Sequence, residues 1–333
     1  ENISGQMKKL GMSCDWSRER FTMDEGLSAA VRQVFVTLYD SGFIYKGSRM
    51  VNWDTKLMSA VSDLEVNLEE QTGKLWSVKY KCGDEFITIA TTRPETILAD
   101  TAVAVNPDDE RYKSFIGKTA IIPIVNREVP IIADEYVDKE FGSGCVKITP
   151  AHDFNDYEIG LKHDLEVISC MKLDGTMSDD DFMPENYKNL DRFEARDQIV
   201  NELSELGFLV SADDHVIQLP KGDRSKSILE PMITDQWFVK TKELADRGIA
   251  EVENENMKFI PKNWEKTYFE WMYNIQDWCI SRQIWWGHQI PAWYDEDGNI
   301  YVATTESEVR EKYKLSDDLK LSQDKDVLDT WFS

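Results

Sequence analysis

The sequence has little of what marks a secreted, disulfide-stabilised or metal-binding chain. Among its 333 residues are five cysteines, which lie far apart and never form a Cys-x-x-Cys pair. This usage is typical of a reducing compartment and argues against a disulfide scaffold or a zinc ribbon. Only four histidines are present, too few at ligand spacing for a catalytic metal site. We therefore expect a cytoplasmic protein with no bound metal.

Long hydrophobic runs are also absent. No segment approaches about 18 consecutive apolar residues, so the sequence predicts no membrane span. The first residues lack the basic and apolar regions of a signal peptide. The chain begins without methionine and ends in the middle of a pattern, which favours a piece of a longer protein.

Basic residues are scarce relative to acidic ones. The chain has 38 Lys and Arg against 62 Asp and Glu, a formal net charge of −24. Residues 66–218 hold 15 basic and 31 acidic residues, which gives −16 for this part alone. Such acidity argues against broad nonspecific binding to nucleic acid, although the less acidic flanks could still carry local basic patches.

Hydrophobic periodicity indicates a helical start followed by a β-rich middle. Residues 22–25, Thr-Met-Asp-Glu, read as a capping box opening an amphipathic helix that Gly42 ends. From about residue 74 the period becomes two, which predicts a hairpin of residues 76–82 and 86–92. Residues 51–54 are expected to form a short strand or turn.

Further elements follow from the same reasoning. Short strands are expected at 119–125, 129–133 and 145–148, and helices at 155–162 and 192–206. Many short strands separated by Pro and Gly resemble a barrel more than a doubly wound sheet. We therefore predict a mixed α/β chain, in which a β-rich, barrel-like domain at 66–218 is inserted between flanks at 1–65 and 219–333.

One stretch, residues 142–157, carries most of the chemistry. Lys147 and Thr149 lie two apart on an expected strand and so share a face, and Asp153 and Asp156 lie three apart at a helix start. Together they suit a small cationic ligand that bears a hydroxyl. Asp153 could instead act only as the N-cap of the helix.

A second stretch, residues 91–96, reads Thr-Thr-Arg-Pro-Glu-Thr. It crowds hydroxyls, a guanidinium and a carboxylate at a strand end, although Pro94 could also mark nothing more than a helix start. A third, residues 277–294, interleaves aromatic rings with Arg282 and His288, a pattern that fits stacking on a nucleotide, an apolar pocket or an ordinary aromatic core. Cys145 is expected to be an inert buried thiol.

Together these stretches resemble the class I aminoacyl-tRNA synthetases of the valine, isoleucine and leucine group, in the valine-type form. Residues 91–96 are similar to the threonine-rich motif of their editing domain, and residues 142–157 to its second motif, Lys-x-Thr-Pro-Ala-His-Asp-x-x-Asp-Tyr. Residues 281–294 and 329–333 are similar to catalytic-domain sequence. The resemblance implies that 66–218 is the editing domain and that the flanks belong to a Rossmann-type catalytic domain.

The resemblance also implies a function. The chain would hydrolyse mischarged threonyl-tRNA(Val), and threonyl-adenylate would be a further candidate substrate. Its partner would be the aminoacylated 3′ end of tRNA(Val), and the protein would be a monomer. The implied catalytic residues are Lys147, Thr149, Asp153 and Asp156. Substrate contacts would come from Thr92, Arg93, Thr96, Phe141 and His152. Trp331 and Trp278 would line the synthetic amino-acid pocket.

Two signatures of the family, His-Ile-Gly-His and Lys-Met-Ser-Lys-Ser, do not occur in the sequence. We therefore expect no aminoacylation by this chain, no cofactor for editing, and ATP with Mg²⁺ only in the full-length parent enzyme. An isoleucine-type editing domain and a module that binds aminoacyl ends without hydrolysis remain alternatives. A metal-dependent hydrolase is a third alternative.

Overall fold

The computed structural model describes residues 2–333, and the chain divides into two compact units. The first unit combines the N-terminal part, as far as Tyr45, with Trp237–Ser333, and the second comprises Lys46–Gln236. The chain passes from one to the other within strands β1 (Ile44–Asp54) and β10 (Glu230–Val239). Residues 66–218, the expected inserted domain, lie within the second unit.

The first unit contains most of the helices. They are α1 (Asn2–Lys9), α2 (Glu25–Asp40), α5 (Lys242–Glu253), α6 (Trp264–Tyr273), α7 (Glu306–Tyr313) and a 3-10 turn, η1 (Trp16–Arg18). The capping box predicted at Thr22 is wrong, because the Asp24 carboxylate accepts the Leu27 amide at 2.8 Å and makes Asp24 the N-cap. Arg20 holds that carboxylate from the other side. The predicted end is confirmed: Gly42 has φ +79°, a conformation that glycine adopts without strain.

Short antiparallel strands complete the first unit. They are β11 (Trp278–Cys279), β12 (Ser281–Arg282), β13 (Ala292–Tyr294), β14 (Ile300–Val302), β15 (Ser322–Gln323) and β16 (Val327–Leu328). β13 pairs with β14 and β15, β12 with β16, and β10 with β11. Phe35 of α2 packs edge-on against Trp237 with ring centroids 5.4 Å apart. Each fully buried aromatic ring of this kind contributes about 1.5–3 kcal/mol to folding.

The second unit is built on a curled sheet. The strands of this sheet are β3 (Val66–Cys82), β4 (Glu85–Thr91), β5 (Ala102–Val105), β6 (Thr119–Ile121), β7 (Glu128–Ala133), β8 (Cys145–Ile148) and β9 (Leu209–Gly222). A separate short strand, β2 (Ser59–Val61), pairs with β1 instead. The order in the curled sheet is β4-β3-β6-β7-β5-β8, with β9 on the other side of part of β3. β5 and β7 run parallel, whereas the other pairs in this order are antiparallel. Since β4 and β8 also contact each other, the sheet curls into a half-barrel.

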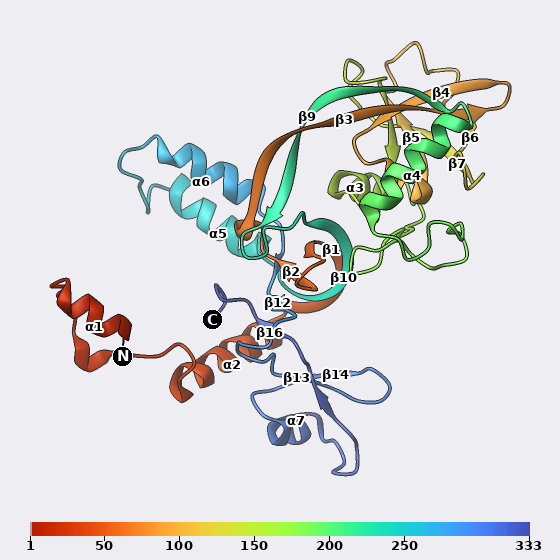
Figure 1. Cartoon of the computed structure of the whole chain (residues 1–333). Helices are drawn as coiled ribbons and strands as arrows, with labels where there is room; N and C mark the ends of the chain where they lie inside the picture. Colours follow the sequence, from red (N-terminus) through yellow and green to blue (C-terminus); the bar gives the residue numbers. More distant parts are fainter. Residues whose placement is uncertain (1) are drawn as a thin grey trace. The chain divides into compact units, whose positions relative to one another are not determined.

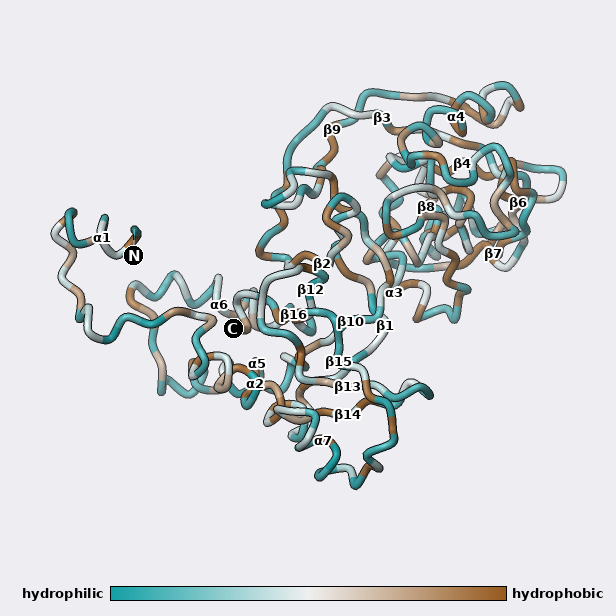
Figure 2. The backbone as a smooth tube through the Cα atoms, turned by 60° about the horizontal axis from the view of Figure 1, so that its bottom comes forward, coloured by the Kyte–Doolittle hydropathy of each residue, from teal (hydrophilic) through white to brown (hydrophobic). Residues whose placement is uncertain are grey.

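A long two-stranded ribbon leads into this half-barrel (Figure 1). β3 and β9 pair from Val66 opposite Gly222 to Val78 opposite Leu209, with a bulge near the inner end. The outer half is largely exposed and mostly hydrophilic in Figure 2, whereas Val78 and Tyr80 are buried. The β3 strand is thus exposed to solvent in its first part and becomes part of the hydrophobic core where apolar and polar residues begin to alternate.

The remaining elements flank the strands. They are α3 (Phe154–Lys162), α4 (Arg192–Glu205) and the 3-10 segments η2 (Asp63–Glu65) and η3 (Pro94–Ala99). The hairpin, the strand at 145–148 and both helices are confirmed. Each helix differs from its predicted bounds by one residue at one end, whereas β3 begins at Val66, ten residues before the predicted start of the hairpin. Residues 51–54 prove to be the end of the longer β1. The strand predicted at 119–125 is too long, because Pro123 and the positive φ values of Ile124 and Asn126 turn the chain after Ile121.

Among residues 2–333, no helix combines the length and the apolar character needed to cross a membrane.

Candidate editing site

Asp100 and three buried side chains around it form one hydrogen-bonded group, which we call the Asp100 cluster (Tyr80, Asp100, Lys147 and Thr149). Lys147 Nζ lies 3.0 Å from Asp100 Oδ1 and also donates to Thr149 Oγ1. Thr149 Oγ1 in turn donates to the same carboxylate oxygen at 2.6 Å. The Tyr80 hydroxyl donates to Asp100 Oδ2 at 2.5 Å. An ammonium, two hydroxyls and a carboxylate are therefore held together in the interior.

Strand pairing brings this cluster together. β5 runs antiparallel to β8, with Ala102 opposite Ile148, and the Thr101 amide donates to the Ile148 carbonyl at 2.8 Å. Asp100 directly precedes this pairing, so it lies beside the side chains at the end of β8. Lys147 and Thr149 point the same way because side chains two apart on a strand share a face. The sequence spacing predicted this last feature.

The two aspartates at the start of α3 have different surroundings. Asp153 is the N-cap: its Oδ1 accepts the amides of Asn155 at 2.8 Å and Asp156 at 3.1 Å. Asp156 is buried, and its Oδ2 accepts the Thr149 amide at 2.8 Å. Asp156 therefore lies next to the Asp100 cluster, whereas Asp153 holds the turn that places it there.

Electrostatics sets Asp156 apart as well. Burial raises the pKa of its carboxyl to about 7, against the opposing charge of Lys147, and the nearby Asp153 adds to the rise. A carboxyl with this pKa is protonated in a large share of molecules near neutrality. A cation placed against it would favour the ionised form.

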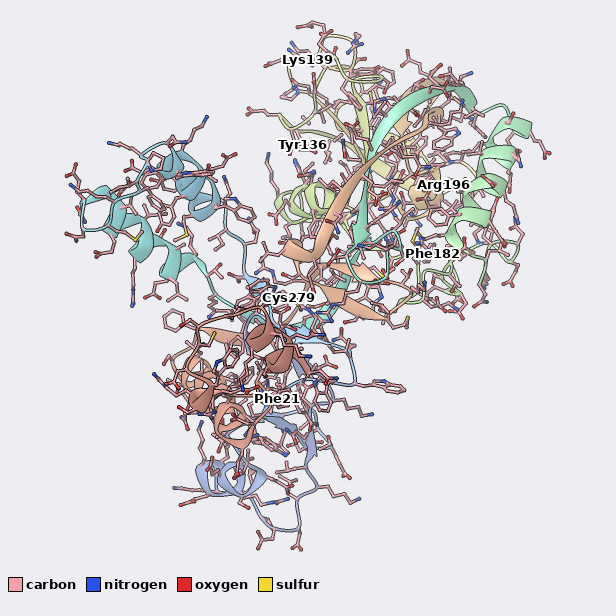
Figure 3. The ribbon with its side chains drawn as sticks, turned by 60° about the vertical axis from the view of Figure 1, so that its left-hand side comes forward. Phe21, Tyr136, Lys139, Phe182, Arg196 and Cys279 are labelled. Carbon is pink, nitrogen blue, oxygen red and sulfur yellow. The ribbon has the colours of Figure 1, made fainter. Side chains whose placement is uncertain are left out.

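The residues of the 91–96 stretch form a second buried network of charges. Arg93 donates to the Glu95 carboxylate at 3.1 Å, to the His152 carbonyl at 2.8 Å and to Glu230. Arg196 of α4, on the side of that helix that faces the rest of the unit in Figure 3, also binds Glu95. These bonds hold the strand end beside the turn that follows β8.

His152 is buried within the same region. Its Nε2 accepts the Cys170 amide at 2.9 Å, and burial, with the charges of Arg93 and Lys147, lowers its pKa to about 3. The ring is therefore neutral at pH 7. Burial likewise raises the pKa of the Cys145 thiol to about 12, as expected for an inert cysteine.

The other predicted substrate contacts are more dispersed. Thr96 is buried and its hydroxyl donates to the Arg93 carbonyl at 3.0 Å, while Thr92 is half-buried. Phe141 is exposed on the loop between β7 and β8, which also carries the Tyr136 and Lys139 labelled in Figure 3. The Phe141 ring packs edge-on against the His215 ring, with ring centroids 5.8 Å apart. Phe141 is therefore accessible to a ligand, whereas the buried Thr96 is not.

The two tryptophans assigned to a synthetic pocket lie in the first unit. Trp278 is half-buried and packs on Phe332, with ring centroids 6.1 Å apart. Trp331 is 69% exposed, and its amide donates to the buried Asp329 carboxylate at 2.7 Å. An exposed indole on an anchored backbone is free to contact a ligand or another part of a longer chain.

No group of three or more His, Cys, Asp or Glu side chains suited to a metal ion occurs in residues 2–333. A hollow of about 330 Å³ does occur in the second unit, beside the turn that follows β8. Its lining is largely apolar: Ala151, Val167, Ser169, Met171, Lys172, Leu173, Met232 and Ile233. None of the predicted site residues lines it, and the titratable chemistry lies with the Asp100 cluster and Asp156 instead.

Sequence reasoning missed the carboxylate at the centre of the site. Asp100 lies 47 residues before Lys147 and 20 after Tyr80, and nothing in local periodicity joins them. Its position in the sequence was a usable signal: this carboxylate lies four residues after Thr96 and two residues before an apolar strand, Ala102–Val105. Glu230 was missed for the same reason, since it lies 137 residues from Arg93.

The chain belongs to the family of class I tRNA synthetases: the model of tRNA synthetases class I (I, L, M and V) matches residues 1–333. The particular relatives are valine–tRNA ligases. Those of Legionella pneumophila strains Lens and Paris are each 57% identical over 333 residues, covering 99% of this chain and 36% of theirs. The chain thus matches a segment of little more than a third of those ligases.

One solved structure is also similar to the chain. It is the ternary complex of Agrobacterium radiobacter K84 agnB2 LeuRS with tRNA and LeuAMS. The sequences are 16% identical, the TM-score is 0.35, and the match covers 99% of this chain and 46% of the other.

Proposed function

We propose that this chain hydrolyses the ester of threonyl-tRNA(Val), the editing reaction of a valine–tRNA ligase. The observation that carries the proposal is the convergence of Lys147, Thr149 and Asp156 in one buried group, within a chain similar to those ligases over its whole length. The partner would be the aminoacylated 3′ end of tRNA(Val). The flanks would belong to a Rossmann-type catalytic domain completed elsewhere in the longer protein.

The chemical need for such a site is specific. A pocket shaped for valine cannot strongly reject threonine, which has a hydroxyl in place of a methyl group. A second site that hydrogen-bonds the hydroxyl discriminates in the opposite sense, because valine would leave buried polar groups unpaired. Lys147 and Thr149 supply polar groups of this kind, both of them buried.

Asp156 would bind the α-ammonium of the amino acid. It uses Oδ2 for the Thr149 amide, which fixes its carboxylate and leaves the other oxygen for the ligand. Asp153 would act chiefly through the helix start, since it caps α3. A cationic amino group beside Asp156 would also draw its carboxyl into the charged form.

The remaining contacts would hold the nucleotide. Phe141 and Thr92 would lie against the amino acid and the terminal adenosine, with Thr96 behind the wall. Arg93 would face the adenosine or its phosphate, although Glu95 and Glu230 already occupy much of its guanidinium. His152, neutral and bonded to the Cys170 amide, would orient the segment and not transfer protons.

A water molecule would be the nucleophile. It would attack the ester carbonyl carbon, the bond to the ribose oxygen would break, and free threonine and the tRNA 3′ hydroxyl would leave. Positioning and stabilisation of the developing oxyanion would supply most of the rate. No cofactor is assigned to this step. ATP and Mg²⁺ would serve aminoacylation in the longer protein, where Trp331 and Trp278 would contact valine.

The test is hydrolysis of threonyl-tRNA(Val) by the 333-residue chain, with valyl-tRNA(Val) as the control substrate and parallel reactions with a chelator. We expect selective, chelator-resistant hydrolysis of the threonyl ester. Asp156→Ala should abolish it, whereas Glu158→Ala, at an exposed position on the same helix, should not. Binding without hydrolysis in the folded chain would reject the proposal in favour of a binding module. Loss of activity with the chelator would favour a metal-dependent hydrolase.

A further inference from the structure

Asp100 is a fully buried carboxylate at the centre of the candidate site. It follows η3 and directly precedes the strand pairing of β5 with β8. Its Oδ1 accepts from Lys147 Nζ at 3.0 Å and from Thr149 Oγ1 at 2.6 Å. Its Oδ2 accepts from the Tyr80 hydroxyl at 2.5 Å. Both oxygens are therefore committed to side chains of the cluster, and neither is left for a ligand.

This arrangement fixes the hydrogen-bonding capacity that Lys147 and Thr149 keep. A lysine ammonium has three donors, and two are used, by Asp100 and by the Thr149 hydroxyl. The threonine hydroxyl gives its only proton to Asp100 and accepts one from Lys147, so one lone pair remains. Together the two side chains thus offer one donor and one acceptor.

A ligand hydroxyl complements that pair, because it can accept from the ammonium and donate to the Thr149 oxygen at once. A methyl group can do neither, so the remaining Lys147 donor and the remaining Thr149 acceptor stay unpaired. Without Asp100 the Thr149 hydroxyl could rotate and present its proton, so the pattern of donor and acceptor would no longer be fixed. The buried Lys147 would also lose the carboxylate at 3.0 Å.

We propose that Asp100 is the positioning residue that sets the preference of this site for a hydroxyl-bearing aminoacyl group. It acts through Lys147 and Thr149 and does not touch the substrate. The inference rests on the proposed hydrolysis of threonyl-tRNA(Val) and assigns to Asp100 the specificity of that reaction.

The experiment compares two substrates that differ by the hydroxyl alone: threonyl-tRNA(Val) and 2-aminobutyryl-tRNA(Val), whose side chain is threonine without its oxygen. Initial rates give kcat and KM for each, with the 333-residue chain and with Asp100→Asn and Asp100→Ala. The readout is the ratio of the two kcat/KM values. Asn keeps an acceptor oxygen but loses the charge, whereas Ala removes both.

We expect the ratio to fall at least about threefold in Asp100→Asn and about tenfold or more in Asp100→Ala, since charge-assisted hydrogen bonds are the stronger ones. The change should be in kcat for the threonyl substrate, with KM little altered, because contacts to the phosphate backbone supply much of the affinity of proteins for nucleic acids. The matched control is Asp134→Asn, another buried aspartate paired with a lysine in the same unit. It should lower stability and leave the ratio unchanged.

Near-UV circular dichroism establishes that each variant is folded. If Asp100→Ala does not fold, Asp100→Asn decides alone. A folded Asp100→Asn protein whose ratio equals that of the unsubstituted chain overturns the inference while the proposed function stands. Absence of threonyl-tRNA(Val) hydrolysis in the unsubstituted chain overturns the proposed function itself. The reactions of the unsubstituted chain therefore distinguish this outcome from an effect of Asp100.

Discussion

Arg196 and Glu95 form a two-pronged ion pair that joins α4 to the segment following β4. Arg196 Nε lies 2.8 Å from Glu95 Oε2, and Nη2 lies 2.9 Å from Oε1. Glu95 is only 1% exposed. Burial raises the pKa of its carboxyl, but the bonds from Arg196 and the charge of Arg93 outweigh that effect, so the pKa is lowered overall. The carboxylate is therefore ionised and depends on its two arginines.

We expect Arg196→Ala to lower the free energy of unfolding by about 1–3 kcal/mol, because the buried Glu95 carboxylate loses two charge-assisted hydrogen bonds and keeps only Arg93 as its charged partner. Urea denaturation at pH 7 measures this. Arg224→Ala is the control, since Arg224 is 54% exposed in its side chain and pairs with Glu65 at the surface. Such surface pairs contribute about 0–1 kcal/mol. Equal losses from the two substitutions would contradict the assignment.

Local pattern was sufficient for those features that depend on neighbours in sequence. The two-residue alternation located the hairpin of β3 and β4, and the spacing of Lys147 and Thr149 placed their side chains together. Where two local signals competed, pattern chose wrongly: Thr22 and Asp24 are both good N-cap residues, and the helix begins after the second.

Strand order and register could not be predicted in the same way. Asp100 meets Lys147 because β5 pairs with β8, and alternation within a strand shows which side chains share a face but not which strand lies beside it. The same limit hid Glu230, which reaches Arg93 from β10. The centre of the site therefore depends on long-range pairing, whereas its edges depend on local spacing.

Asp134 should make stability depend on acidity. Burial raises the pKa of its carboxyl, but hydrogen bonds from Lys162, the Tyr136 amide and His163 outweigh this and lower it to about 2. A lowered carboxyl pKa contributes stability that is present above the unfolded value, near 4, and is lost as the pH falls toward 2. Asp134→Asn should cost about 1–3 kcal/mol at pH 7.

Urea denaturation of both proteins at pH 7, 4 and 2.5 tests this account. The difference in unfolding free energy should shrink steadily as the pH is lowered through this window. A difference that stays constant would show that the carboxylate charge of Asp134 contributes nothing and that the loss comes from packing alone.

Asp156 should govern the pH dependence of the proposed hydrolysis. With a pKa of about 7 in the free protein, its carboxyl is ionised only as the pH rises through neutrality. Binding of a substrate ammonium requires the ionised form, so kcat/KM for threonyl-tRNA(Val) should rise between pH 6 and 8, about tenfold per pH unit on the acidic side. Three charged groups shift this pKa: Lys147 lowers it, whereas Asp153 and Asp100 raise it.

The profile of Asp153→Asn provides the matched comparison, since that change removes a neighbouring negative charge that raises the pKa of Asp156. The acidic limb should move to lower pH, while the asparagine still caps α3. If the acidic limb of Asp153→Asn lies at the same pH as that of the unsubstituted chain, a group other than Asp156 controls the reaction.

His152 should remain neutral far below its ordinary range, and this has a measurable consequence for the whole fold. Burial, together with the charges of Arg93 and Lys147, lowers its pKa to about 3. Because Nε2 accepts the Cys170 amide, the ring proton is on Nδ1. Between the unfolded value near 6.5 and about 3, the unfolded chain binds the proton that the folded chain refuses, so His152 makes stability fall as the pH drops through that window.

Nitrogen-detected NMR should therefore show the Nδ1–H tautomer of His152 unchanged from pH 8 to pH 4. Replacement separates the acceptor from the ring: His152→Gln can still accept the Cys170 amide, whereas His152→Ala leaves that buried donor unpaired at a cost of about 1–3 kcal/mol beyond the cavity. The alanine variant should accordingly be the less stable in urea, and the glutamine variant should lose the acid-dependent part. Titration of the ring near pH 6.5 would mean instead that solvent reaches it, and would return His152 to consideration as a proton-transfer group in hydrolysis.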